Sequence, residues 1–469
     1  MIKTLISILI ISIIFISCKK NEFETSPNFQ LKFSTDSIIF DTIFSGIGST
    51  TKHFKVYNPS SKDVEISQIY LAKGDQSKYR LNIDGKASNF ESKISLKAKD
   101  SMYLFVEVNI NTNQDALLEQ DSIVFKTNGN LQDIKLLAWG QDVHLINGQT
   151  IKSTNWTSDK PYLVYNSMLI DTNQVLRIDA GTKIYFHRGS RMYVAGTLEV
   201  NGTFEKPVIM QGDRLEQMYS DVPGQWEGIW LMNGSKHNTF QWSEIKNAII
   251  GIQVDTLADG NVPTLSIHDT KIEHMSYAGI YAQGTTIFAT NCLISDCGYY
   301  NLALTIGGSY DFYHCTLANY WQNSFRNTPS LIINNYYSYQ NQVIIRDIVH
   351  AGFYNCIIYG DRENEVFIEA VTVSGAINYE FDHCLLKYTT DSKIDINKLN
   401  NCVENKNPLF VDKNKYNFNI DTLSPAIDKG LRSNIDKFTE FLNFDLNNKS
   451  RTGDVAPDIG AYEWIKKEK

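Results

Sequence analysis

One short phrase recurs through the middle of the chain and constrains its fold more than any other feature. It reads as a polar residue, a cysteine, any residue and an aliphatic residue. The four copies are Asn291-Cys292-Leu293-Ile294, His314-Cys315-Thr316-Leu317, Asn355-Cys356-Ile357-Ile358 and His383-Cys384-Leu385-Leu386. Two earlier segments keep the frame with a hydroxyl in place of the thiol, Trp242-Ser243-Glu244-Ile245 and Asp269-Thr270-Lys271-Ile272.

The spacing of this slot predicts a solenoid. Successive copies, from position 243 to position 384, are 27, 22, 23, 41 and 28 residues apart. Repeats of roughly 20 to 30 residues that are rich in strand-forming side chains indicate stacked β coils, each in contact with its neighbours. The step of 41 residues leaves two interpretations open: two coils, or one coil with a long excursion.

The cysteines themselves are predicted to face the interior. Equivalent positions in stacked coils lie about 4.8 Å apart, and a free cysteine behaves as a small hydrophobic side chain. A zinc site would need paired ligands at a spacing such as C-x2-C. Cys292 and Cys297 are five residues apart and have no such partner. We therefore expect a ladder of thiols, no metal and no cofactor, while a disulfide between these two cysteines stays open.

The first residues have the pattern of an export signal. Lys3 precedes an apolar run from Leu5 to Ile16, followed by Ser17 and Cys18. The run is too short for a lasting membrane span. A cysteine directly after a small residue resembles the lipobox of bacterial lipoproteins. The resemblance implies a signal peptide of residues 1–17, acylation of Cys18, for example with palmitate, and a membrane anchor. The alternative is a plain secreted protein.

The charged residues 19–24 resemble the short export signals of surface lipoproteins in Bacteroidetes, which implies an outer-membrane protein exposed at the cell surface. Residues 18–29 are predicted to form a polar tether. The formal charge of −8 disfavours nucleic-acid partners and, more weakly, long acidic polysaccharides, because like charges repel.

Residues 30–145 are predicted to form a β-sandwich. Short alternating strands at 52–56, 102–108 and 122–125 are separated by turn sequences such as Asn58-Pro59, and this pattern is typical of sandwiches. The segment resembles the immunoglobulin-like modules of bacterial surface proteins, which implies a spacer or adhesive unit. It has no cysteine pair and no core tryptophan of the antibody type, so the resemblance concerns architecture only.

Residues 146–400 are predicted to form a right-handed parallel β-helix. Short apolar runs with glycine at their corners, such as 194–203 and 224–230, suit coils whose strands turn sharply between faces. This stretch resembles the opening coils of right-handed parallel β-helix repeat proteins. The predicted fold class is thus all-β, with a sandwich followed by a solenoid.

Residues 401–469 are predicted to form a C-terminal cap. Three phrases occur in order, at 407–412, 423–430 and 456–464, and together they resemble the C-terminal region of the β-helix surface proteins called choice-of-anchor Q. An open solenoid end exposes strand edges and apolar core, so a segment with few repeats is suited to cover it. The resemblance implies a fold and a location but no single activity.

No catalytic motif is present, and we expect no catalytic residues. The best cluster for acid–base chemistry is Asp269, Lys271, Glu273 and His274, of which the first three share one strand face by period two. We interpret these residues as an outer face of salt-bridging charges, and they remain the candidates if the protein is an enzyme.

Trp226 and Trp230 are candidates for stacking on a sugar, with core packing as the alternative interpretation. Two functional hypotheses follow. The first is a lipid-anchored, non-catalytic envelope protein whose β-helix binds a polysaccharide or an envelope protein, or serves as a structural surface. The second is a polysaccharide lyase or glycoside hydrolase of a surface glycan-degrading system, which would need converging titratable residues in a groove.

Overall fold

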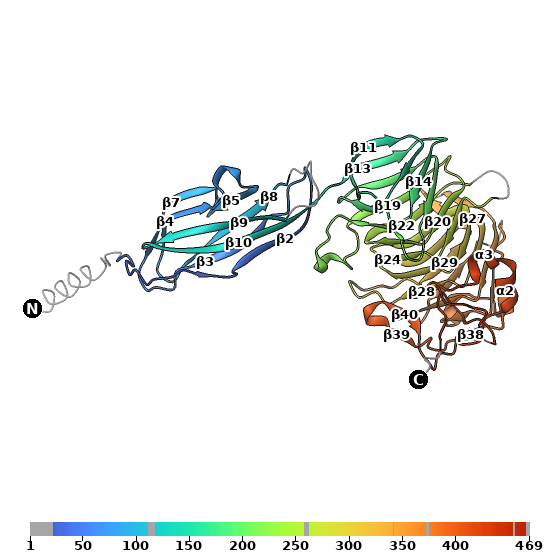
Figure 1. Ribbon diagram of the computed structural model, residues 1–469. Helices are drawn as coiled ribbons and strands as arrows, with labels where there is room; N and C mark the ends of the chain where they lie inside the picture. Colours follow the sequence, from blue (N-terminus) through green and yellow to red (C-terminus); the bar gives the residue numbers. More distant parts are fainter. Residues whose placement is uncertain are drawn as a thin grey trace, which may run out of the picture. The chain divides into compact units, whose positions relative to one another are not determined.

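Figure 1 shows the protein as a computed structural model. The structure describes residues 22–110, 118–257, 262–340, 342–371, 375–453 and 455–465. The chain divides into two compact units, residues 1–143 and 144–469. The predicted signal peptide and the predicted lipidation site, Cys18, lie outside the described residues. Within the described ranges, no helix has the length and apolar character needed to cross a membrane.

The first unit is a β-sandwich of two five-stranded sheets. One sheet has the order β1 (Lys32–Phe33), β3 (Lys52–Tyr57), β8 (Ser101–Val108), β5 (Tyr79–Ile83) and β6 (Lys86–Ala87). The other has the order β2 (Ser37–Phe44), β10 (Asn130–Gln141), β9 (Leu118–Thr127), β4 (Val64–Leu71) and β7 (Phe90–Leu96). The inward side chains of both sheets, such as Leu104 and Phe125, form one core. Strand β8 alternates between buried and outward residues, which is the period-two pattern of its sequence.

Part of the predicted tether belongs to this sandwich. The Glu24 amide donates to the Asp63 carbonyl at 2.7 Å, and the Asn128 side-chain amide donates to the Glu24 carbonyl at 2.9 Å. Phe23 also forms a β-bridge with Asp63. Residues 22–29 are therefore held by hydrogen bonds instead of forming a flexible linker, because the sandwich offers partners to their backbone groups.

The second unit is a parallel β-helix built on a 26-stranded sheet. From β13 to β25, strands pair in parallel with the third strand further along the chain, so each coil has three sides, which we call faces A, B and C. The chain passes from face B to face C to face A within every coil. Apolar side chains from all three faces fill the interior as one continuous core.

The strands of each face follow the chain order. Face B contains the first halves of β11 (His144–Ile151) and β13 (Tyr162–Ile170), then β15 (Lys183–Phe186), β18 (Val208–Gly212), β21 (Ser243–Lys246), β24 (Lys271–Met275), β26 (Leu293–Cys297), β28 (Thr316–Asn319), β33 (Ile357–Gly360), β36 (Leu385–Leu386) and β38 (Val403–Glu404). Face C contains the second halves of β11 and β13, then β16 (Arg191–Val194), β19 (Trp226–Leu231), β22 (Ala248–Val254), the first halves of β25 (Ala278–Thr290) and β27 (Tyr300–Tyr313), β29 (Leu331–Asn334) and β34 (Val366–Glu369). Face A contains β12 (Thr154–Trp156), β14 (Val175–Asp179), β17 (Thr197–Asn201), β20 (Asn238–Gln241), β23 (Leu265–His268), the second halves of β25 and β27, β32 (Ile348–Tyr354), β35 (Glu380–Asp382) and β37 (Leu399–Asn400).

The cysteine slot lies at the corner between faces A and B. Each cysteine follows a residue in the left-handed region, such as Asn291 at φ +52° and Asn355 at φ +55°. Asparagine tolerates this region better than most residues, which explains the polar residue before the thiol. The Cys315 amide faces the Cys356 sulfur at 3.4 Å, and both side chains are buried. The slot thus points inward in successive coils.

The ladder extends beyond the four predicted cysteines. Ser243 and Thr270 share a hydrogen bond of 2.9 Å between their hydroxyl oxygens, so they are earlier rungs. Cys402 lies next to Cys384 at the other end. Every cysteine that the structure describes is a free thiol.

The 41-residue step is one coil with an excursion. Strand β28 pairs directly with β33, and Thr316 is the partner of Ile357, so Cys315 and Cys356 belong to neighbouring coils. Between them the chain forms β29 and an antiparallel hairpin of β30 (Tyr336–Tyr339) and β31 (Gln342–Ile345) before it re-enters the solenoid at β32.

The C-terminal region, which we continue to call the cap, covers the flank of the β-helix instead of its open end. It contains β39 (Phe410–Asp412), β40 (Asn417–Ile420), α2 (Arg432–Lys437) and α3 (Thr439–Leu442), drawn in orange and red in Figure 1. Its apolar side chains pack on the outer side of face B, where Ala461 joins Leu293, and of face A, where Ile435 joins Tyr313. The predicted position was the open end. The core of the last coils is instead contacted by Tyr388, Ile394 and Leu399.

Candidate functional site

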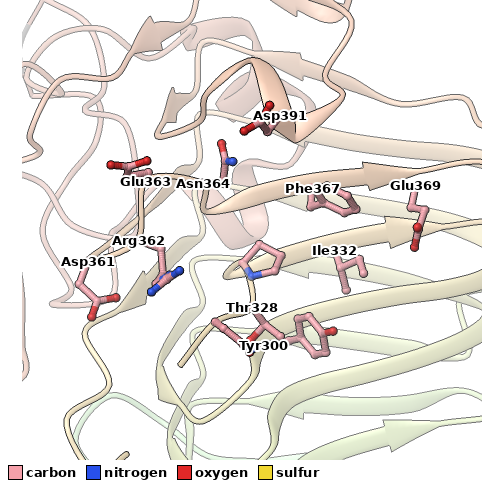
Figure 2. A pocket seen from close by; sticks show the side chains of 12 residues that line it. Tyr300, Thr328, Ile332, Asp361, Arg362, Glu363, Asn364, Phe367, Glu369 and Asp391 are labelled. Atoms are coloured by element: carbon pink, nitrogen blue, oxygen red, sulfur yellow. The ribbon is translucent and has the colours of Figure 1, made fainter. Parts of the chain in front are cut away.

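Face C carries a hollow in the later coils. Excursions enter face C from the face B side at 213–225, 320–330 and 361–365, while the β30–β31 hairpin follows on the face A side. The excursions 320–330 and 361–365, together with Asp391, enclose a hollow of about 660 Å³. Figure 2 shows this hollow, whose floor is formed by strands β27, β29 and β34.

The floor of the hollow is apolar and its rim is polar. Tyr300, Ile332 and Phe367 point outward from the three floor strands. The rim bears one guanidinium, two amides, one threonine hydroxyl and four carboxylates, which belong to Asp361, Glu363, Glu369 and Asp391. A concave site with an apolar floor and a few polar groups is the usual form of a ligand-binding site.

A buried ion-pair cluster fixes the wall of the hollow. The Arg326 side chain is 1% exposed, and its guanidinium donates two hydrogen bonds to the Glu365 carboxylate, at 2.9 and 2.7 Å. It also donates to Asp361. Bidentate pairs of this kind have a defined geometry, so Arg326 joins the two excursions 320–330 and 361–365 into one rigid wall.

Two aromatic side chains of the hollow have distinctive neighbours. Burial, followed by the nearby Tyr277, raises the pKa of Tyr300 to about 12, so its hydroxyl remains a hydrogen-bond donor at neutral pH. The Phe367 ring lies 5.0 Å from the Lys393 ammonium, an arrangement typical of a cation–π contact. A ligand that stacks on Phe367 would share this ring with Lys393.

The two predicted stacking tryptophans have opposite positions. Trp226 is 1% exposed and stacks inside the core on Phe186, with ring centroids 3.9 Å apart. Its indole nitrogen donates to the Lys246 carbonyl. The assignment of Trp226 as a ligand-stacking residue is therefore corrected, since its ring fills the coil interior. Trp230 lies on the outer side of the same strand, near Arg191 and Tyr193.

The predicted acid–base cluster does not converge. Lys271 and Glu273 lie on the outer side of face B, where the Lys271 ammonium pairs with Glu244 at 3.3 Å. Asp269 occupies the corner before this strand at φ +48° and does not share their face. His274 occupies the opposite corner, buried, and bonds to Asp296 at 2.7 Å. These side chains are engaged in structural contacts and form no common site.

Asp269 belongs to a buried network that holds the C-terminal cap. It accepts a hydrogen bond from the Asn291 amide at 3.0 Å, and Asn291 in turn accepts from Arg451 at 2.8 Å. Arg451 also pairs with Glu463 at 2.5 Å. Burial raises the pKa of Asp269 to about 7 and that of Glu463 to about 7, because the charged carboxylate loses its hydration.

A second cluster of titratable groups lies on the outer side of face A. His350 faces Asp311 at 3.2 Å, and the Tyr354 hydroxyl donates to Glu380 at 2.5 Å. Gly352 lies between these residues, where a Cβ would be only 2.6 Å from the His350 ring. The hydrogen bond to Asp311 raises the pKa of His350. The neighbouring cavity holds about 290 Å³ and is lined by His350, Glu380 and several amides.

Sequence reasoning missed most residues of both clusters. The strand 366–369 alternates strictly, so Phe367 and Glu369 were identifiable as outward residues, although not as neighbours of Ile332 or Tyr300. The path of the 41-residue step decides that neighbourhood. Within the described parts of the chain, no group of three or more His, Cys, Asp or Glu side chains is placed to hold a metal ion.

The comparison with protein families agrees with the fold. The family model of a pectate-lyase-like β-helix domain matches residues 148–270, which cover the coils from β11 to β23. No curated protein matches the chain. One similar solved structure is a family 123 glycoside hydrolase from Clostridium perfringens, from a study of glycolipid glycan hydrolysis, with 8% identity and a TM-score of 0.18. That match covers 24% of this chain and 26% of the hydrolase.

Proposed function

We propose that the β-helix is a non-catalytic surface that binds a glycan chain in the hollow of face C. The observation that carries this proposal is the hollow itself, with its floor of Tyr300, Ile332 and Phe367 and its rim of carboxylates and amides. Aromatic rings bury the apolar faces of sugars, and carboxylates and amides accept or donate hydrogen bonds to hydroxyls. The likeness to a pectate-lyase-like domain supports a glycan over a protein ligand.

The test is a binding measurement with glycans. Titration calorimetry of the purified protein against a panel of soluble polysaccharides should identify a ligand whose affinity falls about tenfold in Phe367→Ala, through the loss of one stacking contact. Phe90→Ala removes a similarly sized ring that is 53% exposed on the sandwich and is the matched control. Equal affinities of Phe367→Ala and the unaltered protein for every bound glycan would refute the hollow as the site.

We also propose that Cys18 carries a lipid that anchors the protein to the outer membrane, with the folded units at the cell surface. The support is the apolar run 5–16, the Ser17-Cys18 pair and the resemblance to lipoproteins. More than one acyl chain makes such anchoring stable. Palmitate labelling of cells should mark the protein, and Cys18→Ser should abolish both the label and membrane retention. Retention of an unlabelled Cys18→Ser protein would contradict the anchor.

A second candidate function is glycan cleavage by a lyase or hydrolase, and the cluster on face A favours it. Asp311 and Glu380 are both partners of Gly352 across neighbouring strands, and their carboxylates contact His350 and Tyr354, which lie between them. Glycoside hydrolysis uses a pair of carboxyl groups, one as a general acid and the other as a base or nucleophile. Reducing ends or unsaturated products that form on a glycan panel, and that disappear in Asp311→Asn, would replace the non-catalytic proposal.

A further inference from the structure

The hollow is one end of a longer row of outward side chains on face C. The strand register joins them one by one: Trp230, Gln253, Tyr281, Ala303, Ile332 and Phe367, each paired with the next. We call this the face C row. Since neighbouring strands are about 4.8 Å apart, the row extends for about 24 Å along the helix axis. The sequence repeat places the same face outward in every coil, so the row is built into the fold.

The smallest member of the row, Ala303, does not interrupt the aromatic surface. Ala303 is buried, but the Tyr277 ring lies 5.9 Å from that of Tyr281 and 6.2 Å from that of Tyr300. This places a chain of rings between Tyr281 and the hollow. With the exception of Ala303, the members of the row are partly exposed, so a ligand can reach them.

The charges beside the row select against acidic polymers. The row itself carries no charge, and at its far end Arg191 is neutralised by Glu227 at 3.1 Å. At the hollow, four carboxylates outnumber two cations, the Arg362 guanidinium and the Lys393 ammonium over Phe367. A polyuronate would bring further negative charge to this rim and be repelled. A neutral sugar meets no such penalty, because the carboxylates accept hydrogen bonds from its hydroxyls.

We propose that face C binds a linear, uncharged polysaccharide that runs along the helix axis from Phe367 to Trp230. This inference rests on the proposed glycan-binding function and extends it from the hollow to the whole row. A straight polymer that lies along the axis meets an equivalent side-chain position once per coil. Each additional coil then adds a stacking or van der Waals contact, and affinity rises with chain length until the row is covered.

The test compares oligosaccharides of increasing length. Cello-, manno- and xylo-oligosaccharides, from the disaccharide to the octasaccharide, are titrated against the full protein beside polygalacturonate oligomers. For the series that binds, affinity should rise at least tenfold from the shortest to the longest member. Trp230→Ala should weaken the octasaccharide by about tenfold and leave the disaccharide unchanged, while Phe367→Ala should weaken both. Trp139→Ala, with a ring 45% exposed on the sandwich, is the matched control.

The outcomes bear differently on the hollow and on the face C row. Binding in the hollow that is independent of chain length, or that is unaffected by Trp230→Ala, overturns the row and leaves the hollow in place. Tighter binding of polygalacturonate than of every neutral series overturns the uncharged ligand class. Failure of all the oligosaccharides to bind overturns the glycan-binding function and the row together.

Discussion

At the scale of single residues, burial controls the chemistry of the cysteines. Cys292, Cys297, Cys315, Cys356 and Cys384 are at most 1% exposed, whereas Cys402 is only partly buried. Burial raises the pKa of the Cys297 thiol, since a thiolate inside the coil would lose its hydration. The ladder is therefore a packing feature that depends on reduced, neutral thiols.

Thiol labelling should follow this burial. With a protein that begins at Glu22, we expect a maleimide to modify Cys402 in the folded state and the five buried cysteines only after unfolding. Mass spectrometry of the labelled peptides measures both rates. The variant Cys402→Ser should show no early labelling at all. Prompt modification of Cys315 in the native protein would contradict the inward ladder.

A charge in the ladder should unfold the coil. Cys315→Asp places a carboxylate in the buried slot between Cys292 and Cys356, where the nearby Arg451 is already paired with Glu463, and we expect a loss of at least about 4 kcal/mol. Cys315→Ser should lose about 1 kcal/mol, because the earlier rungs Ser243 and Thr270 already use hydroxyls. Urea denaturation gives both values. Similar losses for the two variants would show that the slot is hydrated.

At the scale of elements, the C-terminal cap is held by buried polar groups whose charges depend on pH. The raised pKa of Asp269, about 7, means that the folded state binds this proton more tightly than the unfolded chain does. Its contribution to stability is therefore greatest below the unfolded pKa of about 4 and falls as the pH rises to about 7. Arg451 and Asn291 do not remove this effect, since desolvation is its largest cause.

Asp269→Asn should remove part of this pH dependence. The amide keeps an oxygen that can accept from Asn291 but cannot ionise, so we expect the variant to be as stable as, or more stable than, the unaltered protein at pH 8 and to lose less stability between pH 4 and 7. Denaturation at several pH values measures the difference. Lys271→Gln, on the same coil but outside the network, is the control. A larger loss at pH 8 in Asp269→Asn would contradict the assignment.

At the scale of the whole molecule, each unit has its own core. Phe54 belongs to the core of the sandwich and Phe240 to that of the β-helix. Separate cores generally unfold as separate cooperative units. Calorimetry should therefore resolve two transitions. Phe54→Ala should lower the midpoint temperature of the sandwich transition, because the loss of this buried ring costs roughly 3 to 5 kcal/mol of unfolding free energy. Phe240→Ala should lower only the midpoint temperature of the β-helix transition. A shift of both transitions in either variant would indicate one cooperative unit.

Much of this architecture could be read from the order of residues. The period-two strands predicted the sandwich, and the recurring cysteine slot predicted the coils and the direction of the thiols, because local patterns set which side of a strand meets the core. The candidate site could not be read in the same way. Tyr300, Ile332 and Phe367 are 32 and 35 residues apart, and only the coil register makes them neighbours.

The sequence by itself determined that this chain alternates, turns and repeats, and hence that it forms a sandwich and a β-helix. The tertiary structure alone decided which outer face stays open. The cap covers parts of faces A and B, Trp226 fills the interior and Trp230 faces outward, while Asp269 is drawn into the cap network. The physical reason is that inward direction is encoded within one strand, whereas contacts between distant coils and the cap depend on register and on the path of each excursion.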